Sequence, residues 1–173
     1  MRVAAASLED LPALAEVHVA SWRSAYAGIL PADYLANLSV ERRHASWRTV
    51  LSEGKSQLLV AMEGTAVVGF VSFGRCRDAA AAQDCGELWA LYVSPVAWST
   101  GVGQALWKEA RVRLNASGFR SASLWVIKEN QRAIRFYCAA GFAIEADSEK
   151  EFELGGARIR EVRMVADNGS EHL

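Results

Sequence analysis

The sequence predicts an α/β fold in which a mixed, twisted sheet of about seven strands is flanked by helices. Segments with apolar residues three and four positions apart, typical of helices, lie near the N-terminus and again in the second half of the chain. Short apolar runs bounded by glycine or polar turns indicate strands. Their order is helices, a three-strand meander, and then strand–helix–strand–helix followed by two strands. We expect one domain over residues 1–166 and a polar tail over 167–173.

The N-terminal elements are defined by capping residues. A short strand, Val3–Ala6, precedes Ser7 and Asp10, which have the spacing of a helix capping box. The following helix carries an apolar stripe from Leu11 to Trp22. Pro31 is suited to open a second helix, and Ser39 to cap a third that ends near Leu51.

The remaining elements follow from alternating apolar runs and glycine stops. Helices are expected at 101–116, before Gly118, and at 130–139, before Gly141. The crossover between the strands at 87–93 and 121–127 is expected to be right-handed, which makes these strands parallel. After the first strand, Val3–Ala6, the expected strands are Gln57–Met62, Val67–Phe73, Glu87–Val93, Ser121–Ile127, Phe142–Phe152 and Arg158–Val165.

Composition excludes several classes of protein. The 173 residues carry 19 basic and 20 acidic side chains without a basic block, which argues against a nucleic-acid groove. No apolar run approaches the length of a membrane span. Three cysteines without metal-ligand spacing suit a reducing compartment, so we expect a cytoplasmic protein. Three scattered histidines predict no metal site. A homodimer is left open.

The segment from Leu91 to Leu106 carries the strongest functional signal. It consists of an apolar strand, a short polar loop with Pro95, and Gly101 and Gly103 where a helix begins. The first N–H groups of a helix lack partners within the helix and lie at its positive end, and glycine lets an anion approach them. The segment therefore predicts a phosphate or pyrophosphate site on main-chain amides. The alternative is that the two glycines only permit a tight turn.

A second segment, Leu124–Phe142, combines a strand, a helix and a stop signal. Asn130 is placed to cap the helix, and Ala133 and Tyr137 fall on one of its faces. Gly141 stands where a C-terminal helix glycine belongs, and Phe142 opens the next apolar run.

Together, these two segments resemble the cofactor-binding blocks of the GNAT N-acetyltransferase superfamily. The first follows the pattern Q/R-x-x-G-x-G/A, except that Trp98 replaces the leading Gln or Arg and Ser99 follows it. The second follows V-x-x-x-N-x-x-A-x-x-x-Y-x-x-x-G-F. The resemblance implies a GNAT-like sheet whose central parallel strands splay apart, with acetyl-CoA in the gap. Because Trp98 is not cationic, a charged contact to the cofactor is missing at that position.

The resemblance implies roles for particular residues. The amides around Ser99–Gln104 hold the pyrophosphate, and the main chain of Leu91–Val93 pairs with the pantetheine arm and polarises the thioester. Asn130 either contacts the pantetheine or only caps its helix. The expected cofactor-binding residues are Leu91, Tyr92, Val93, Trp98, Ser99, Thr100, Gly101, Val102, Gly103, Gln104, Asn130, Ala133, Phe136 and Tyr137.

Two residues are predicted to carry the chemistry. Tyr137 aligns with the family tyrosine that protonates the departing thiolate, and its alternative is a core tyrosine. Glu87 is expected in phase with Trp89 and Leu91 on the cofactor-binding strand. It is the candidate base for the substrate ammonium and a candidate acceptor contact. Its alternatives are an ordinary strand-end carboxylate or proton removal through water.

The acceptor is expected to meet the first helix. Trp22 and Tyr26, four residues apart, share a helix face and are candidates to line an acceptor pocket. The alternative for Trp22 is core packing. We therefore predict an acetyl-CoA-dependent N-acetyltransferase without metal that acts by direct transfer on a primary amine of a small molecule or peptide. The alternatives are a non-catalytic acyl-CoA sensor and an enzyme acting on protein N-termini or lysines.

Overall fold

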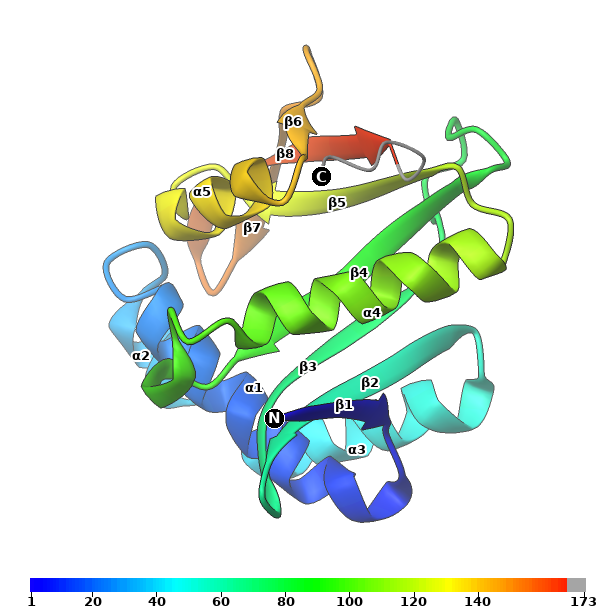
Figure 1. The fold of residues 1–173 in the computed structure, drawn as a ribbon. Helices are drawn as coiled ribbons and strands as arrows, with labels where there is room; N and C mark the ends of the chain where they lie inside the picture. Colours follow the sequence, from blue (N-terminus) through cyan, green and yellow to red (C-terminus); the bar gives the residue numbers. More distant parts are fainter. Residues whose placement is uncertain (168–173) are drawn as a thin grey trace.

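Residues 1–167 of the computed structural model form an eight-stranded sheet with helices on both faces (Figure 1). The strand order is β1-β2-β3-β4-β5-β8-β6, with β7 paired to β8. The strands are β1 (Arg2–Ala5), β2 (Ser56–Glu63), β3 (Ala66–Arg75), β4 (Cys85–Val93), β5 (Ser121–Ile127), β6 (Ala143–Ile144), β7 (Lys150–Leu154) and β8 (Ala157–Asp167). The α-helices are α1 (Leu11–Ala25), α2 (Ala32–Ala36), α3 (Val40–Glu53), α4 (Val102–Ala116) and α5 (Gln131–Ala139). Two short 3₁₀ helices occupy Leu8–Asp10 and Pro95–Ala97.

Two apolar cores lie on opposite faces of the sheet. Val71 belongs to the core under α4, which includes Leu106. The neighbouring Phe70 belongs to the core under α1 and α3, which includes Leu14 and Trp47. This opposition follows from the alternation of side chains along β3. The predicted α/β layering is confirmed, with one more strand than expected.

The parallel strands β4 and β5 splay apart after three residue pairs. They are paired only from Cys85–Ser121 to Glu87–Ser123. Beyond this point β4 stays with β3 as far as Val93, and β5 stays with β8 as far as Ile127. The expected splay is therefore present, and the facing edges of β4 and β5 are free of each other where the two predicted cofactor segments begin.

The predicted caps are present. The Ser39 hydroxyl accepts a hydrogen bond from the Arg42 N–H at 3.1 Å, and Asn130 Oδ1 accepts one from the Ala133 N–H at 3.1 Å. The Ser7 N–H donates to Asp10 Oδ2 at 2.8 Å, as expected for a capping box. These contacts span only three residues, which is why they are readable from sequence.

The expected strand Phe142–Phe152 is wrong. The structure divides it into β6 and β7, which both pair with β8. Asp147 between them has a φ of 56°, which no strand accommodates, and the Ser148 hydroxyl donates to the Glu145 carbonyl at 2.7 Å. This local hydrogen bond and the left-handed Asp147 take the place of the strand pairing with β8, so the chain turns between β6 and β7.

At the C-terminus, β8 includes Asp167, which was expected to begin the polar tail. The rest of that predicted tail, residues 168–173, lies outside the described residues. Within residues 1–167, no helix has both the length and the apolar character needed to cross a membrane.

Candidate active site

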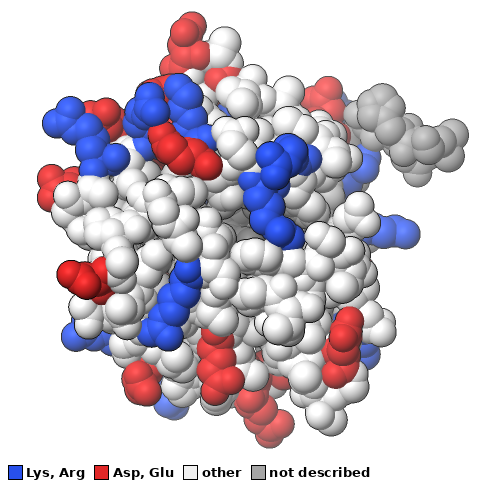
Figure 2. All heavy atoms as spheres, turned by 90° about the vertical axis from the view of Figure 1, so that its left-hand side faces the viewer, with Lys and Arg blue, Asp and Glu red and all other residues white. Residues whose placement is uncertain are grey.

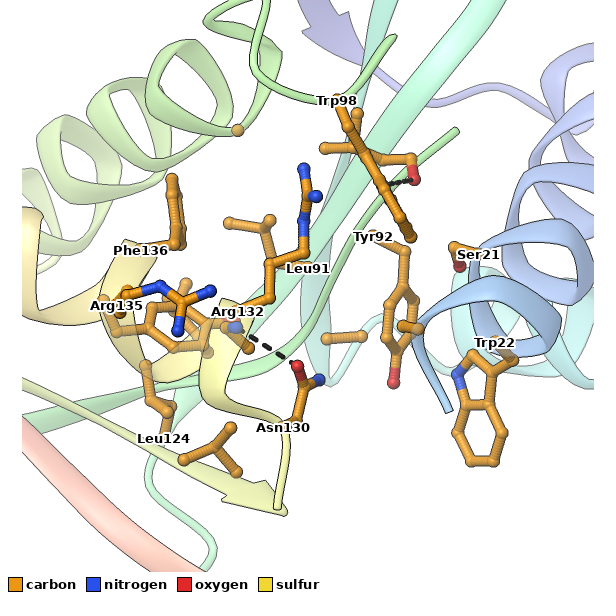
Figure 3. A pocket seen from close by; sticks show the side chains of 18 of the residues that line it. Ser21, Trp22, Leu91, Tyr92, Trp98, Leu124, Asn130, Arg132, Arg135 and Phe136 are labelled. Atoms are coloured by element: carbon orange, nitrogen blue, oxygen red, sulfur yellow. Dashed lines mark hydrogen bonds between the residues drawn. The ribbon is translucent and has the colours of Figure 1, made fainter. Parts of the chain in front are cut away.

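A pocket of about 480 Å³ opens where β4 and β5 diverge (Figure 3). Its walls come from α1, β4, the loop before α4, the first turn of α4, β5 and α5. The surface view of this side of the molecule shows a hollow near its middle with basic side chains beside it (Figure 2). The two predicted cofactor segments, which are separated in the chain by residues 107–123, thus face a common space.

The first turn of α4 forms one wall of the pocket. Ser99 and Gly101 adopt left-handed backbone conformations, with φ of 64° and 92°. Alternation of backbone conformation before a helix turns successive N–H groups into one concavity, and the helix start adds its unpaired N–H groups. Gly101, Gly103 and Gln104 line the pocket. This arrangement fits the diphosphate of acetyl-CoA.

The free edge of β4 forms the second wall. Leu91, Tyr92 and Val93 line the pocket on the side that β5 has left. The Val93 carbonyl accepts a hydrogen bond from Trp98 Nε1 at 2.8 Å. An extended group such as a pantetheine arm can add to such an edge as a further strand.

Helix α5 supplies the third wall, with Asn130, Ala133, Phe136 and Tyr137 all lining the pocket. The predicted capping function of Asn130 is confirmed. Burial raises the pKa of Tyr137 above its ordinary value, with a smaller contribution from Tyr92. The phenol is therefore protonated at neutral pH and able to donate a proton.

Of the expected cofactor-binding residues, all but Thr100 and Val102 line the pocket. The Thr100 hydroxyl is turned away and donates to the Ala97 carbonyl at 2.8 Å. Val102 is 1% exposed and packs in the core under α4. The helical turn at this point directs these two side chains inward while the neighbouring residues face the pocket.

Glu87 is not where the sequence placed it. The register between β3 and β4 shifts at Ser72 and Phe73, so Trp89 is an extra, bulged residue in β4. Leu88, not Glu87, therefore shares a face with Leu91. Glu87 is 1% exposed, and it does not line the pocket.

The carboxylate of Glu87 is bound by Arg77. It accepts the Arg77 N–H at 2.8 Å and Arg77 Nε at 3.1 Å, and it forms an ion pair with the same guanidinium. A carboxylate occupied in this way is poorly placed to take a proton from a substrate. Among the residues that line the pocket there is no Asp, Glu or His.

Trp22 and Tyr26 line the opposite end of the pocket, together with Ser21. Their rings meet edge to face at 5.0 Å, and Trp22 also meets the Tyr92 ring at 6.2 Å. The Trp22 Nε1 group is buried, and it interacts only weakly with the Tyr92 hydroxyl, since no hydrogen bond of normal geometry is formed there within residues 1–167. Trp22 is thus a lining residue rather than only part of the core.

Two further segments pack together next to Tyr26. Tyr26, Leu30 and Leu35 form a cluster with Ile127 and Ile159. Arg23 holds the last turn of α2 in place, since Nε donates to the Leu35 carbonyl at 3.1 Å. The α1–α2 segment and the β7–β8 hairpin thus pack together beside Tyr26, although within the described residues neither α2 nor the hairpin lines the pocket.

Four large lining residues were missed in the sequence: Trp89, Trp125, Arg132 and Arg135. The last two follow Asn130 closely and lie three residues apart, so helical spacing offered a signal for them. Trp125 is oriented by distant groups. Its Nε1 donates to Asp78 Oδ2 at 3.0 Å, and Lys150 Nζ lies 3.8 Å from its ring centroid. No local pattern predicts such contacts.

Comparisons with known proteins agree with this geometry. Residues 15–142 match the acetyltransferase (GNAT) family. The chain is 38% identical over 158 residues to the uncharacterised N-acetyltransferase YuaI of Bacillus subtilis, covering 91% of this chain and 87% of that protein. It is 26% identical to a spermidine N(1)-acetyltransferase of Thermoplasma acidophilum, covering 84% and 90% of the two chains.

Solved structures share the fold. The PaiA N-acetyltransferase of Thermoplasma acidophilum in complex with coenzyme A superposes with a TM-score of 0.74 at 24% identity, over 96% of this chain and 98% of that one. The YncA protein of Salmonella typhimurium, solved with acetyl-CoA, gives 0.73 at 20% identity over 99% and 96%.

The chain belongs to the GNAT family of acetyltransferases. It is an acetyl-CoA-dependent N-acetyltransferase, as predicted.

Proposed function

We propose that the enzyme transfers the acetyl group directly to a primary amine of a small molecule. The observation that carries this proposal is a single pocket in which the α4 start, the free edge of β4, α5 and the aromatic end of α1 meet. Acetyl-CoA and the amine would thus contact different walls of the same pocket and meet where these walls join. No cysteine among residues 1–167 lines the pocket, so no lining thiol is available to form an acetyl-enzyme intermediate.

Bound acetyl-CoA supplies an activated acyl group on a thiolate leaving group. The amides of Ser99–Gln104 are suited to hold its diphosphate, and the free edge of β4 to align its arm. An N–H group of that edge is then available to polarise the acyl carbonyl. The Asn130 side-chain nitrogen, which does not take part in the cap and interacts with the Tyr26 hydroxyl, is proposed as a further contact to the arm.

Tyr137 is proposed as the group that protonates the leaving thiolate, since its raised pKa keeps the proton in place until it is needed. For the opposite proton, the burial of Glu87 and its binding by Arg77 favour the alternative of transfer through water. The acceptor ammonium would lose its proton to solvent within the open part of the pocket.

The acceptor is proposed to be small because Trp22 and Tyr26 place bulky aromatic rings at one end of a pocket of about 480 Å³. A long peptide would need an open groove there. The relative named for spermidine is the reason to include this polyamine in the test. The absence of lining carboxylates among the described residues favours an amine with an apolar body, since a polycation would find no counter-charge.

The test is release of free CoA thiol from acetyl-CoA in the presence of a panel of aryl- and alkylamines, spermidine and short peptides. Turnover with small amines, and acetylated amine detected by mass spectrometry, is the expected result. Peptides reacting faster than every small amine would overturn the small-molecule assignment. Absence of thiol release with every acceptor, despite binding of acetyl-CoA, would favour the sensor.

The cytoplasmic location, the lack of nucleic-acid partners, the possible homodimer and the division into a domain (1–166) and a tail (167–173) stay predictions.

A further inference from the structure

Arg132 of α5 lies against the side chain that departs from the family motif. Its Cζ atom is 3.9 Å from the centroid of the Trp98 ring (Figure 3). Its terminal nitrogen is 3.5 Å from the Ser99 hydroxyl. A helix on one side of the pocket thus reaches across to the loop that begins α4 on the other.

Trp98 is itself held at its edge. Its indole N–H donates to the Val93 carbonyl at 2.8 Å, which leaves the ring face directed toward Arg132. A guanidinium over an indole ring is attracted to its π-face and keeps its N–H groups, which lie in the guanidinium plane, available. The indole therefore works as a platform that limits where Arg132 can point.

The charge of Arg132 is not balanced by an acidic side chain among the described residues. Within residues 1–167, neither Arg132 nor Arg135 forms an ion pair, although both line the pocket. Arg132 is also exposed, so its guanidinium is accessible to a ligand. Its place beside Ser99 puts this free cation next to the left-handed turn that starts α4.

We propose that Arg132, positioned by Trp98, is the cation that binds the diphosphate of CoA, in place of the cationic side chain that position 98 lacks. The charge comes from α5, and position 98 contributes the platform instead. This rests on acetyl-CoA as donor. It assigns to the second cofactor segment a phosphate contact that the first segment lacks. Arg135 lines the same pocket without contacting the platform, so it is not assigned this role.

The test is calorimetric binding of CoA, which needs neither an acceptor nor turnover. Arg132→Ala is expected to weaken binding about 10- to 100-fold, the usual effect of losing a charge-assisted contact. Arg132→Lys should recover only part of this, because an ammonium lacks the planar fork. Arg48→Ala, an exposed residue of α3 outside the pocket, removes the same charge and should leave binding unchanged.

A double-mutant cycle tests the platform. Trp98→Ala alone should weaken binding about 3- to 10-fold. Added to Arg132→Ala, it should cost much less than it does alone, since the platform has then lost what it positions. Losses that multiply in full would overturn the positioning role of Trp98.

A third binding experiment distinguishes the diphosphate of CoA from its 3′-phosphate. Dephospho-CoA lacks the 3′-phosphate but keeps the diphosphate, so Arg132→Ala should weaken its binding by the same factor as for CoA. A loss seen with CoA alone would move Arg132 to the 3′-phosphate and overturn the proposal. Wild-type affinity in Arg132→Ala would also overturn it, whereas a wild-type protein that fails to bind CoA would overturn the donor assignment as well.

Discussion

Tyr137 has the property that its proposed role requires, because its surroundings hold the phenol in the protonated form. Removing only the hydroxyl, in Tyr137→Phe, is expected to lower kcat about 10²-fold or more with little change in CoA affinity. The measurement is steady-state kinetics with calorimetric CoA binding. Tyr34→Phe, in α2 and outside the pocket, is the matched control.

Tyr92 is the competing proton donor, since it also lines the pocket and burial raises its pKa. If Tyr92→Phe loses the rate and Tyr137→Phe keeps it, the acid is on β4 and Tyr137 is a packing residue.

Glu87 is expected to be structural. Glu87→Gln keeps the shape but removes the charge that Arg77 binds, so we expect the free energy of unfolding to fall by about 1–3 kcal/mol. The pH dependence of the rate should keep the wild-type form, because the proton leaves through water. Chemical denaturation and rate–pH profiles measure the two effects.

A different result would show that Glu87 is the general base after all. If Glu87→Gln slows the reaction strongly at low pH and little at high pH, where the free amine is abundant, Glu87 removes the proton despite its ion pair.

Among the elements, the start of α4 and the middle of α5 meet at Gly103. A Cβ atom at this position would lie 3.1 Å from Phe136 Cε2 and 3.2 Å from its Cζ. The glycine therefore allows two helices that line the pocket to approach each other, and the Phe136 ring, which also lines the pocket, has to give way to any side chain at position 103.

Gly103→Ala is expected to weaken CoA binding several-fold with little loss of stability, because alanine improves helix propensity by up to about 1 kcal/mol. Calorimetry and thermal unfolding measure the two. Gly141→Ala is the control: its φ of 94° predicts a loss of stability, and it does not line the pocket. Unchanged affinity in a folded Gly103→Ala protein would contradict the role of this contact.

At the scale of the molecule, the aromatic cluster around His18 joins α1, α3 and β4. His18 is 6% exposed, accepts a hydrogen bond at Nδ1 from Trp47 Nε1 at 2.9 Å, and stacks on Tyr92 at 5.0 Å. Burial, with a smaller effect of Arg43, lowers the pKa of His18 to about 3. The folded protein therefore holds this residue neutral, with its ring nitrogen accepting.

This predicts a pH-dependent stability. In the unfolded chain the imidazole binds a proton near pH 6.5, while in the folded protein it does so only near pH 3, so stability falls as pH drops from 6.5 toward 3. Between pH 7 and 5 this residue alone should remove about 2 kcal/mol from the free energy of unfolding. Urea titrations at the two pH values measure it.

His18→Gln, which can still accept from Trp47, should be less stable than wild type at pH 7 but lose less on acidification. His44→Gln leaves His18 in place and should lose as much as the wild type. If the stability of the wild type, His18→Gln and His44→Gln proteins falls equally with pH, groups other than His18 cause the loss of stability in acid.

By itself, the sequence determined the α/β order, the caps of α3 and α5 and the two segments that meet at the pocket and are proposed to bind acetyl-CoA. Each depends on residues within a few positions of one another. Ser39 and Asn130 act on the backbone three residues further on, and Gly101 acts on its own φ. Such interactions can be predicted from local spacing, because the groups are close in the chain and meet independently of the tertiary fold.

Only the tertiary structure decided which side chains face the pocket. The bulge at Trp89 reverses the alternation of β4 and turns Glu87 away from Leu91. Arg132 meets Trp98 across thirty-four residues of sequence, and Trp125 is oriented by Asp78. These contacts depend on strand register and on how helices pack across the splay, which arise from the free energy of the whole fold and leave no spacing in the sequence by which to find them.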